Sequence, residues 1–349
     1  MSDGVELESL LSRRCACYHD PGYACSRRAA AHRYWRYAGI AGATILQRRR
    51  YMQQHFDHIR RVLMWEPRGH YDMYGCVLTP AVTPTADLGV LFMHNEGYST
   101  MCGHGVIALV TALVQTGTIP ARGQETTLNL DTPAGLVRAT AHLNSQGRVE
   151  HVSFLNVDSF LYARDLVLEV PAYGRLSVDV AFGGAFYAIL AAAQVGLRVV
   201  PEETKRLVDA AEAIKRAVNA RLSIKHPGEE DLNFLYGTIL SGPPEDPGHH
   251  SRNICVFAHV EVDRSPTGTG VSARLAQLHA RGELAEGQQI EIESILGAAS
   301  SFRGRVAKTT HVGSYEAIVP EVSGSAFMSG RHEFIVEKAD RLGQGFLLT

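Results

Sequence analysis

The 349-residue sequence has no surplus of charge of either sign, few cysteines and no long hydrophobic run. Its 34 Lys and Arg residues are balanced by 36 Asp and Glu residues, so the basic footprint of a protein that tracks nucleic-acid phosphates is missing. Six cysteines are too few for a disulfide scaffold, and no secretory hydrophobic segment precedes them. The apolar runs are too short or too interrupted to span a bilayer. We therefore expect a cytoplasmic protein without a nucleic-acid or membrane partner.

The remaining composition is that of an ordinary globular protein. Hydrophobic residues make up 45% of the chain and charged residues 20%, which excludes general disorder, collagen and coiled coil. The length favours two globular domains or one large one. Small molecules are the expected partners.

The first 46 residues differ from the rest of the chain. Residues 21–50 hold seven Arg and no Asp or Glu. A cleaved organellar leader would share this bias, but it would also be rich in Ser, and this stretch has one. A metal site could use the side chains of Cys15, Cys17, His19 and Cys25, although the paired spacing of structural zinc is absent. We favour a divergent, poorly ordered leader over 1–46 and expect no metal.

Hydrophobic periodicity predicts the elements that follow. Apolar residues at helical spacing predict one amphipathic helix over Gln47–Met64, which Pro67 ends. The later elements form two series, each with a Gly-rich turn that leads into an apolar helix. In chain order they are strands Gly75–Leu78 and Gly89–His94, helix Gly105–Gln115, strands from Thr126 to Val170, strand Leu176–Val180, helix Pro201–Ala220, helix Gly270–Arg281 and strands from Ile290 to Phe346.

The two Gly-rich turns form an internal repeat. Phe92-Met93-His94, a gap of seven residues and Cys102–Ala108 make the first copy. Phe257-Ala258-His259, the same gap and Thr267–Ala273 make the second, with Phe, His, Gly, Gly, Val and Ala identical in register. The copies lie close to half a chain length apart. This repeat predicts two similarly folded α/β halves, each with a strand that feeds a Gly-rich turn and a helix.

A Gly-x-Gly turn that opens a helix is suited to binding an anion. It leaves backbone N–H groups free, and the positive end of the helix dipole lies at the same place. Pseudo-symmetry would set the two turns face to face across a cleft. We therefore expect one carboxylate to be held between the two helix ends.

Cys102 lies at the start of the first of these helices. The helix dipole and free N–H groups lower the pKa of such a thiol from about 8.5 toward neutrality, so it can act as a base or a nucleophile. A buried inert cysteine is the alternative, but the flanking Gly103 and His104 are poor packing partners. The equivalent residue of the second turn is Thr267, whose alcohol cannot act as a base at neutral pH. The pair is therefore chemically unequal.

Two further side chains beside the turns have two interpretations each. Asp263 can accept a hydrogen bond from an ammonium group, or it can cap the turn that continues through Arg264-Ser265-Pro266. His104 can donate to a substrate oxygen, or it can hydrogen-bond within its own loop. Cys76 and Cys255 lie inside strand patterns and are expected in the core.

These residues resemble the two active-site motifs of the proline racemase family. The motifs are Met101-Cys102-Gly103-His104-Gly105 and Asp263-Arg264-Ser265-Pro266-Thr267-Gly268-Thr269-Gly270. The resemblance runs from about Gln47 to Thr349 and includes the segments Glu66-Pro67-Arg68-Gly69-His70, Phe182-Gly183-Gly184-Ala185-Phe186-Tyr187 and Asn253-Ile254-Cys255-Val256-Phe257.

The resemblance implies a fold and its boundaries. The expected class is α/β, diaminopimelate-epimerase-like, with two pseudo-symmetric α/β halves, mixed sheets wrapped around a central helix and the site in the cleft between the halves. The halves are expected at 47–170, to which 338–349 return, and at 171–337. A homodimer is compatible with this family.

The resemblance also implies a reaction that needs no cofactor. Racemases and hydroxyproline epimerases of the family carry a second cysteine where this chain has Thr267, as trans-3-hydroxy-L-proline dehydratases do. Their substrate has its α-hydrogen and 3-hydroxyl on one face of the ring, so one acid-base group suffices. By this resemblance Cys102 is the base in a dehydration to pyrroline-2-carboxylate. The expected substrate-binding residues are Gly103, His104, Gly268 and Thr269 for the carboxylate, Asp263 for the ring nitrogen and Phe257 for the pocket wall.

One family motif has no counterpart in the first half. Members begin with a strand that carries an Asp-Met-His-Thr-Gly-Gly-Glu-Pro-like sequence, and Tyr37–Gly42 occupies that place without its chemistry. The second half keeps a counterpart at Asp179–Gly184. Two alternatives therefore stay beside the dehydratase: a racemase or epimerase of proline derivatives, which Thr267 disfavours, and an amino-acid-binding variant with impaired catalysis.

Overall fold

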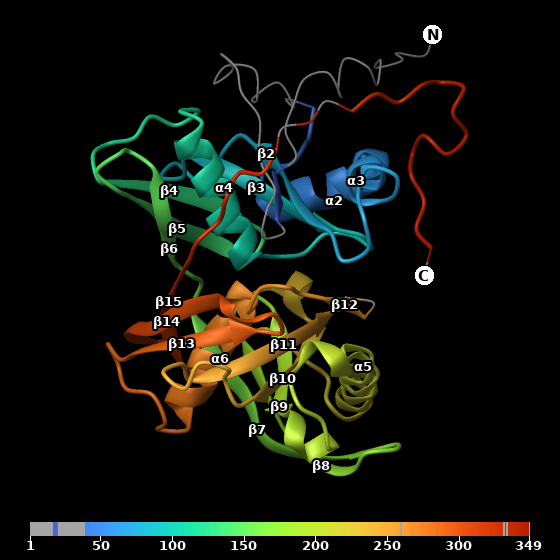
Figure 1. Cartoon of the computed structure of the whole chain (residues 1–349), viewed down its shortest axis with the longest axis vertical. Helices are drawn as coiled ribbons and strands as arrows, with labels where there is room; N and C mark the ends of the chain where they lie inside the picture. Colours follow the sequence, from blue (N-terminus) through green and yellow to red (C-terminus); the bar gives the residue numbers. More distant parts are fainter. Residues whose placement is uncertain (1–16, 20–38, 259, 331, 333, 349) are drawn as a thin grey trace. The chain divides into compact units, whose positions relative to one another are not determined.

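The computed structural model describes residues 17–19, 39–258, 260–330, 332 and 334–348 (Figure 1). Most of the expected leader, including Cys15 and Cys25 of the hypothetical metal site, lies outside these residues. The chain forms two compact units. The first comprises residues 1–99, 105–152 and 325–349, and the second comprises 100–104 and 153–324. The two compact units divide at 152 and 324. From the sequence we place the boundaries of the repeated halves at 170 and 337, and these boundaries stay predictions.

The first unit is built on a mixed sheet. Its strands are β1 (Cys17–His19), β2 (Tyr74–Thr79), β3 (Leu88–His94), β4 (Glu125–Thr132) and β5 (Gly135–Leu143), and β6 (Val149–Leu155) follows. The pairs β1–β2, β2–β3 and β4–β5 are antiparallel, and β3–β4 is parallel. A parallel pair requires a crossover connection, and helix α4 (Gly103–Gln115) lies between these two strands in the chain. The predicted strands at Gly75–Leu78 and Gly89–His94 are confirmed.

The single helix predicted over Gln47–Met64 is wrong. Two helices replace it, α2 (Ile45–His55) and α3 (Asp57–Met64), with a break at Phe56, whose φ is −129° and ψ 18°. Asp57 explains where the second helix begins. An acidic side chain is favourable in the first turn of a helix, and the Asp57 carboxylate also pairs with Arg60 at 2.7 Å. Phe56 satisfies the helical periodicity, so the pattern alone could not reveal the break.

The second unit is a closed sheet. Its strands are β7 (Ser159–Val170), β8 (Gly174–Phe182), β9 (Phe186–Ala191), β10 (Leu235–Gly242), β11 (Ser251–Phe257), β13 (Gln289–Ser294), β14 (Gly297–Val312) and β15 (Tyr315–Gly324), hydrogen-bonded in that order. β15 also pairs with β7, through Ala317 and Phe160, which closes the circle. The pairs β9–β10 and β11–β13 are parallel and the others antiparallel. The short β12 (Glu261–Val262) pairs with β11.

Helix α6 (Gly268–Ala280) runs inside this sheet (Figure 1). It packs on β7, β8, β9, β14 and β15. Every residue from Gly268 to Leu278 is buried, as expected for a helix enclosed on all sides. The predicted helix Gly270–Arg281 is therefore confirmed, together with the mixed sheet around a central helix.

Helix α5 (Thr204–Arg221) covers the outside of the sheet on β10 and β7. One of its faces is apolar, with Leu207, Ile214 and Val218 in a core cluster with residues of β10 and β11. Pro201–Glu203 forms a short 3₁₀ helix (η3) before it, and two more such helices lie at η2 (Ala192–Val195) and η4 (Glu230–Leu232). The prediction of a helix from Pro201 is thus correct except for its first turn.

The predicted strands up to Phe346 end too late. Among described residues after Gly324 there is no strand, only an isolated bridge between Glu66 and Phe346. This segment belongs to the first unit, where the guanidinium of Arg68 donates to the carbonyls of Gly343 and Ile335. The Arg68 side chain and the single backbone bridge to Glu66 hold the segment instead of a sheet ladder, and the hydrophobic pattern cannot distinguish these two arrangements.

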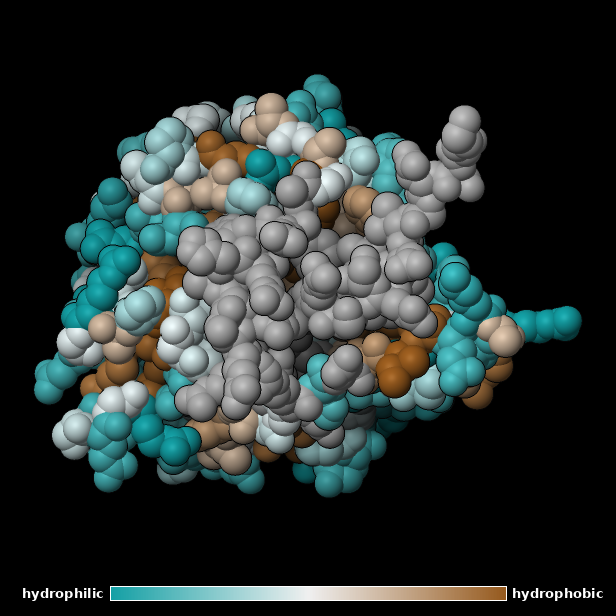
Figure 2. Space-filling model, turned by 90° about the horizontal axis from the view of Figure 1, so that it is seen from above, coloured by the Kyte–Doolittle hydropathy of each residue, from teal (hydrophilic) through white to brown (hydrophobic). Residues whose placement is uncertain are grey.

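Hydrophilic side chains lie around much of the face seen in Figure 2, with hydrophobic side chains grouped between them. None of the helices in the described part of the chain is long and apolar enough to cross a membrane.

Candidate active site

The two Gly-rich turns lie against each other in the second unit. A Cβ atom added to Gly103 would lie 2.5 Å from the Cα of Gly268, and one added to Gly268 would lie 2.5 Å from the Cα of Gly103. The Phe154 ring would be 2.8 Å from the added Cβ at Gly103. No side chain fits at either position. Both glycines are therefore required for the close approach of the two turns.

Two helix N-termini begin at this meeting point. Helix α4 starts at Gly103, directly after Cys102, and helix α6 starts at Gly268, directly after Thr267. The first donor inside α6 is the N–H of Val271, which binds the Thr267 carbonyl at 2.7 Å. The N–H groups of Gly268 and Thr269 precede it and have no carbonyl acceptor within the helix. Backbone N–H groups and a helix dipole thus favour an anion here.

Thr267 has a backbone conformation that is rare for its residue type. Its φ is 65° and its ψ 105°, and a β-branched residue is strained at positive φ. Two hydrogen bonds hold it there. Its N–H donates to Ser265 Oγ at 3.1 Å and its hydroxyl donates to Asp263 Oδ2 at 2.9 Å. The hydroxyl of Thr267 is therefore committed to a carboxylate.

Asp263 accepts hydrogen bonds at both carboxylate oxygens. Besides the Thr267 hydroxyl, it accepts from the N–H of Ser265 at 2.8 Å, and His104 Nδ1 lies 3.0 Å from Oδ2. Burial would raise the pKa of this carboxyl, but the charge of His104 and the hydrogen bonds from His104 and Ser265 lower that pKa below its usual value. Asp263 both caps its turn and pairs with a cation, so the two interpretations of this residue are compatible.

His104 is the cation of this cluster. It is 5% exposed, and its Nδ1 lies 2.9 Å from Ser265 Oγ as well as near Asp263. Burial would lower the pKa of the imidazole, but the Asp263 carboxylate and the negative charge and hydrogen bond of the Cys102 sulfur raise that pKa well above its usual value. The ring of His104 is thus used in a buried pair, between a carboxylate and a thiol.

The side chain of Cys255 also interacts with Thr267. Burial and the Asp263 carboxylate raise the pKa of the Cys255 thiol, against the effect of a hydrogen bond with Thr267. This thiol is therefore neutral, in agreement with its predicted place in the core. Cys76 and Cys102 are also buried.

Comparison with known proteins identifies the family. The family model described as proline racemase matches residues 37–347. The chain belongs to the proline racemase family. A relative from Bacillus cereus named trans-3-hydroxy-L-proline dehydratase is 45% identical over 309 residues, which cover 88% of this chain and 91% of the relative. A relative from Burkholderia multivorans named 3-hydroxyproline 2-epimerase has the same identity and coverage.

A solved structure supports the fold. A hydroxyproline epimerase from Agrobacterium vitis with bound trans-4-hydroxy-L-proline superposes with a TM-score of 0.82 at 32% identity, and 88% of each chain is covered. The expected α/β fold of the proline racemase family is therefore confirmed.

Phe257, the expected wall residue, is buried at the end of β11. Its ring stacks on Tyr236 with centroids 5.4 Å apart, and the Tyr236 ring meets Tyr187 edge-on at 5.9 Å.

The expected site residues all belong to the second unit. They are Cys102, Gly103, His104, Asp263, Thr267, Gly268, Thr269 and Phe257. In the part of the chain that the structure describes, no three His, Cys, Asp or Glu side chains are grouped to hold a metal ion.

Two residues of this region were not predicted from the sequence. Ser265 bonds with both His104 and Thr267. The feature of the sequence that could have indicated this role is its position in a turn, two residues after Asp263. Tyr187 places its hydroxyl 2.7 Å from Thr269 Oγ1. Tyr187 ends a segment that carries the resemblance to the proline racemase family, but no pattern in the sequence connects it with Thr269.

Proposed function

We propose that this protein dehydrates trans-3-hydroxy-L-proline to pyrroline-2-carboxylate, with Cys102 as the base. A relative of this name at 45% identity supports the reaction class, which is that of a hydro-lyase in amino-acid metabolism. The relative named as an epimerase is equally similar, so overall identity does not decide between the two reactions. The decision rests on Thr267.

Thr267 favours dehydration over epimerisation, because epimerisation needs acid-base groups on both faces of the ring. Its hydroxyl is a poor base at neutral pH, and it already donates to Asp263 at 2.9 Å. The neighbouring Cys255 thiol is neutral because burial raises its pKa. Of the three side chains Cys102, Thr267 and Cys255, Cys102 alone then offers an acid-base group for the α-carbon, and dehydration of this substrate requires one face alone.

The substrate is held by charge at both ends in this proposal. The N–H groups at the starts of α4 and α6, from Gly103 and His104 and from Gly268 and Thr269, receive the carboxylate. Asp263 receives the ring nitrogen. His104 contributes its backbone N–H to the carboxylate, because its imidazole is already paired with Asp263 at 3.0 Å.

The chemical step balances without an electron acceptor. The Cys102 thiolate removes the proton from the α-carbon, and the electron pair of that bond forms the double bond to C3. The C3–O bond breaks, and the leaving hydroxide takes the proton from the Cys102 thiol. The enamine product then tautomerises to pyrroline-2-carboxylate.

Incubation with trans-3-hydroxy-L-proline in heavy water tests the proposal. We expect pyrroline-2-carboxylate from the wild type and from Cys76→Ala, and none from a folded Cys102→Ser variant. The C2 epimer with deuterium at the α-carbon would instead establish an epimerase. Thermal stabilisation by the amino acid without turnover would identify a binding protein and contradict the enzymatic proposal.

A further inference from the structure

The segment Phe182–Tyr187 has no part in the reaction above, yet it touches both Gly-rich turns. It consists of the end of β8, a turn through Gly183 and Gly184, and the start of β9. The Gly184 carbonyl accepts a hydrogen bond from Thr100 Oγ1 at 2.8 Å, just ahead of Cys102. The Gly183 carbonyl accepts from Asn156 Nδ2 at 2.7 Å, and the same amide nitrogen donates to Ser272 Oγ in α6 at 2.8 Å.

The two glycines allow this segment to approach the first turn of α6. A Cβ atom at Gly183 would lie 2.2 Å from the carbonyl oxygen of Thr269 and 2.5 Å from the N–H nitrogen of Ala273. A Cβ atom at Gly184 would lie 3.1 Å from Cγ2 of Thr269, and the φ of Gly184 is 102°. The backbone of this turn is therefore in direct contact with Thr269.

Tyr187 fixes the other branch of Thr269. The two hydroxyl oxygens are 2.7 Å apart, and the residues are 0% and 2% exposed. The hydrogen bond between the Tyr187 and Thr269 hydroxyls, with the Gly184 backbone near Cγ2, favours one χ1 rotamer of Thr269. The Thr269 side chain thus has one favoured orientation at the end of α6 where the carboxylate is expected.

We propose that Tyr187 is a positioning residue that orients Thr269 for the substrate carboxylate. The inference rests on the proposed function, because it takes the carboxylate to bind at the start of α6. The Tyr187 ring also meets Tyr236, which stacks on Phe257, so one side chain links the carboxylate end of the site to its aromatic wall.

The test compares ligands with and without a carboxylate. In Tyr187→Phe we expect the KM for trans-3-hydroxy-L-proline and the Kd for L-proline to rise about tenfold, with kcat changed less than about threefold. Binding of L-prolinamide, which lacks the negative charge, should change less than about twofold. Thr269→Val should behave like Tyr187→Phe, the double variant should add little to either, and Thr269→Ser should keep near-native affinity.

Tyr162→Phe is the matched control, because its hydroxyl also bonds within the second unit, to the backbone of Ser223 and Lys225. We expect it to leave both affinities unchanged. The inference is overturned if Tyr187→Phe matches this control, or if it weakens L-proline and L-prolinamide equally, since general loosening of the site would do that. Absence of turnover and of L-proline binding in the wild type would reject the proposed function itself.

Discussion

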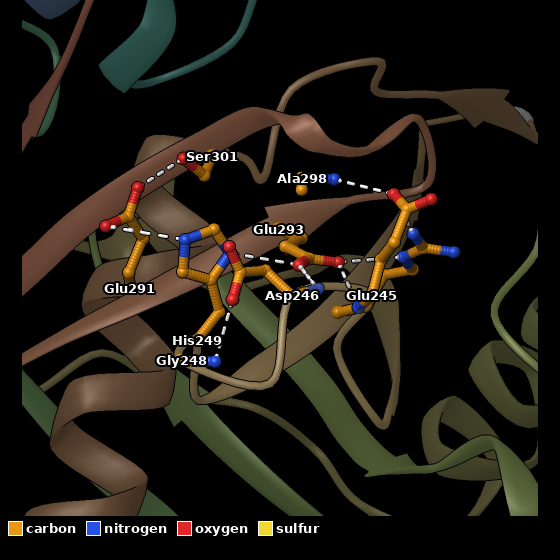
Figure 3. A network of polar contacts seen from close by, with 9 residues as sticks. Glu245, Asp246, Gly248, His249, Glu291, Glu293, Ala298 and Ser301 are labelled. Carbon is orange, nitrogen blue, oxygen red and sulfur yellow. Dashed lines mark hydrogen bonds and ion pairs between the residues drawn. The ribbon is translucent and has the colours of Figure 1, made fainter.

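Two buried carboxylates in the second unit, Asp263 and Glu293, have similar surroundings and different consequences. Each lies beside a histidine, accepts hydrogen bonds from backbone N–H groups and has a lowered pKa. The Glu293 side chain is fully buried on β13 and accepts from the N–H groups of Glu245 and Asp246, at 2.7 and 2.8 Å (Figure 3). It also bonds with His249 Nδ1 at 2.9 Å and Arg252 Nε at 3.0 Å.

The partners of the two carboxylates decide their roles. Glu293 is bonded to two backbone amides, to the guanidinium of Arg252 and to the ring of His249, and it fixes the connection between β10 and β11. The charge partner of Asp263 is an imidazole, which can exchange a proton and lies beside the thiol of Cys102. A buried, ionised carboxylate is therefore not in itself a sign of catalysis. The difference lies in what each histidine contacts next, because His104 lies beside the Cys102 thiol whereas His249 lies beside a second carboxylate, that of Glu291.

Removal of the Asp263 charge should give the largest loss of activity. Asp263→Asn removes the acceptor of His104 and Thr267 and the expected partner of the ring nitrogen, so we expect kcat/KM to fall about a thousandfold or more. Steady-state kinetics of pyrroline-2-carboxylate formation measure this. Circular dichroism serves as the control for folding. Retention of more than about a tenth of the activity in a folded variant would contradict the role assigned to Asp263.

Glu293→Gln should affect stability instead. An amide cannot neutralise Arg252 and presents an NH₂ group to donors that Glu293 now accepts from, so we expect the free energy of unfolding to fall by about 3 kcal/mol. Denaturant titration measures the loss. The variant that remains folded should keep kcat within about threefold of the wild type. A large drop in kcat with unchanged stability would mean that the comparison between the two carboxylates is wrong.

The sequence was informative where chemistry and local structure coincide. Helices α4 and α6 were predictable because a Gly-x-Gly turn precedes an apolar run, and Cys102 and Thr267 were found because they occupy the same place in a repeat. The break at Phe56 was not predictable, because that residue satisfies the helical period on both sides.

Contacts between distant segments explain what the sequence could not supply. His104 and Asp263 each had two local interpretations, and neither included their mutual pair at 3.0 Å. Ser265 and His104 are 161 residues apart, and the segment of Tyr187 reaches Thr269 only through the closed sheet. No periodicity encodes such pairs, because they depend on how strands are ordered.

The pH dependence of stability should separate the members of the His104–Asp263 pair. The folded pKa of His104 lies above its unfolded value of about 6.5, so its contribution is complete below that pH and is lost as pH rises through the folded pKa. Asp263 has a lowered pKa, so its contribution is present above about pH 4 and is lost as pH falls through the folded pKa. Unfolding free energies measured from pH 5 to pH 9 should decline toward alkaline pH in the wild type. His104→Gln should flatten this decline, and an unchanged slope would exclude His104 as its source.

Ser265→Ala should give the smallest change. The hydroxyl of Ser265 accepts from the Thr267 N–H at 3.1 Å and shares Nδ1 of His104, but Asp263 still pairs with that nitrogen when the hydroxyl is lost. We expect a stability loss of about 1 kcal/mol and a decrease in kcat of about threefold to tenfold. Ser159→Ala provides the matched control, because it removes a buried hydroxyl that donates to the Val157 carbonyl and touches none of these residues. It should cost similar stability and leave kcat unchanged. Equal kcat values for the two variants would show that the hydroxyl of Ser265 acts on stability alone, and that Asp263 is sufficient to hold His104.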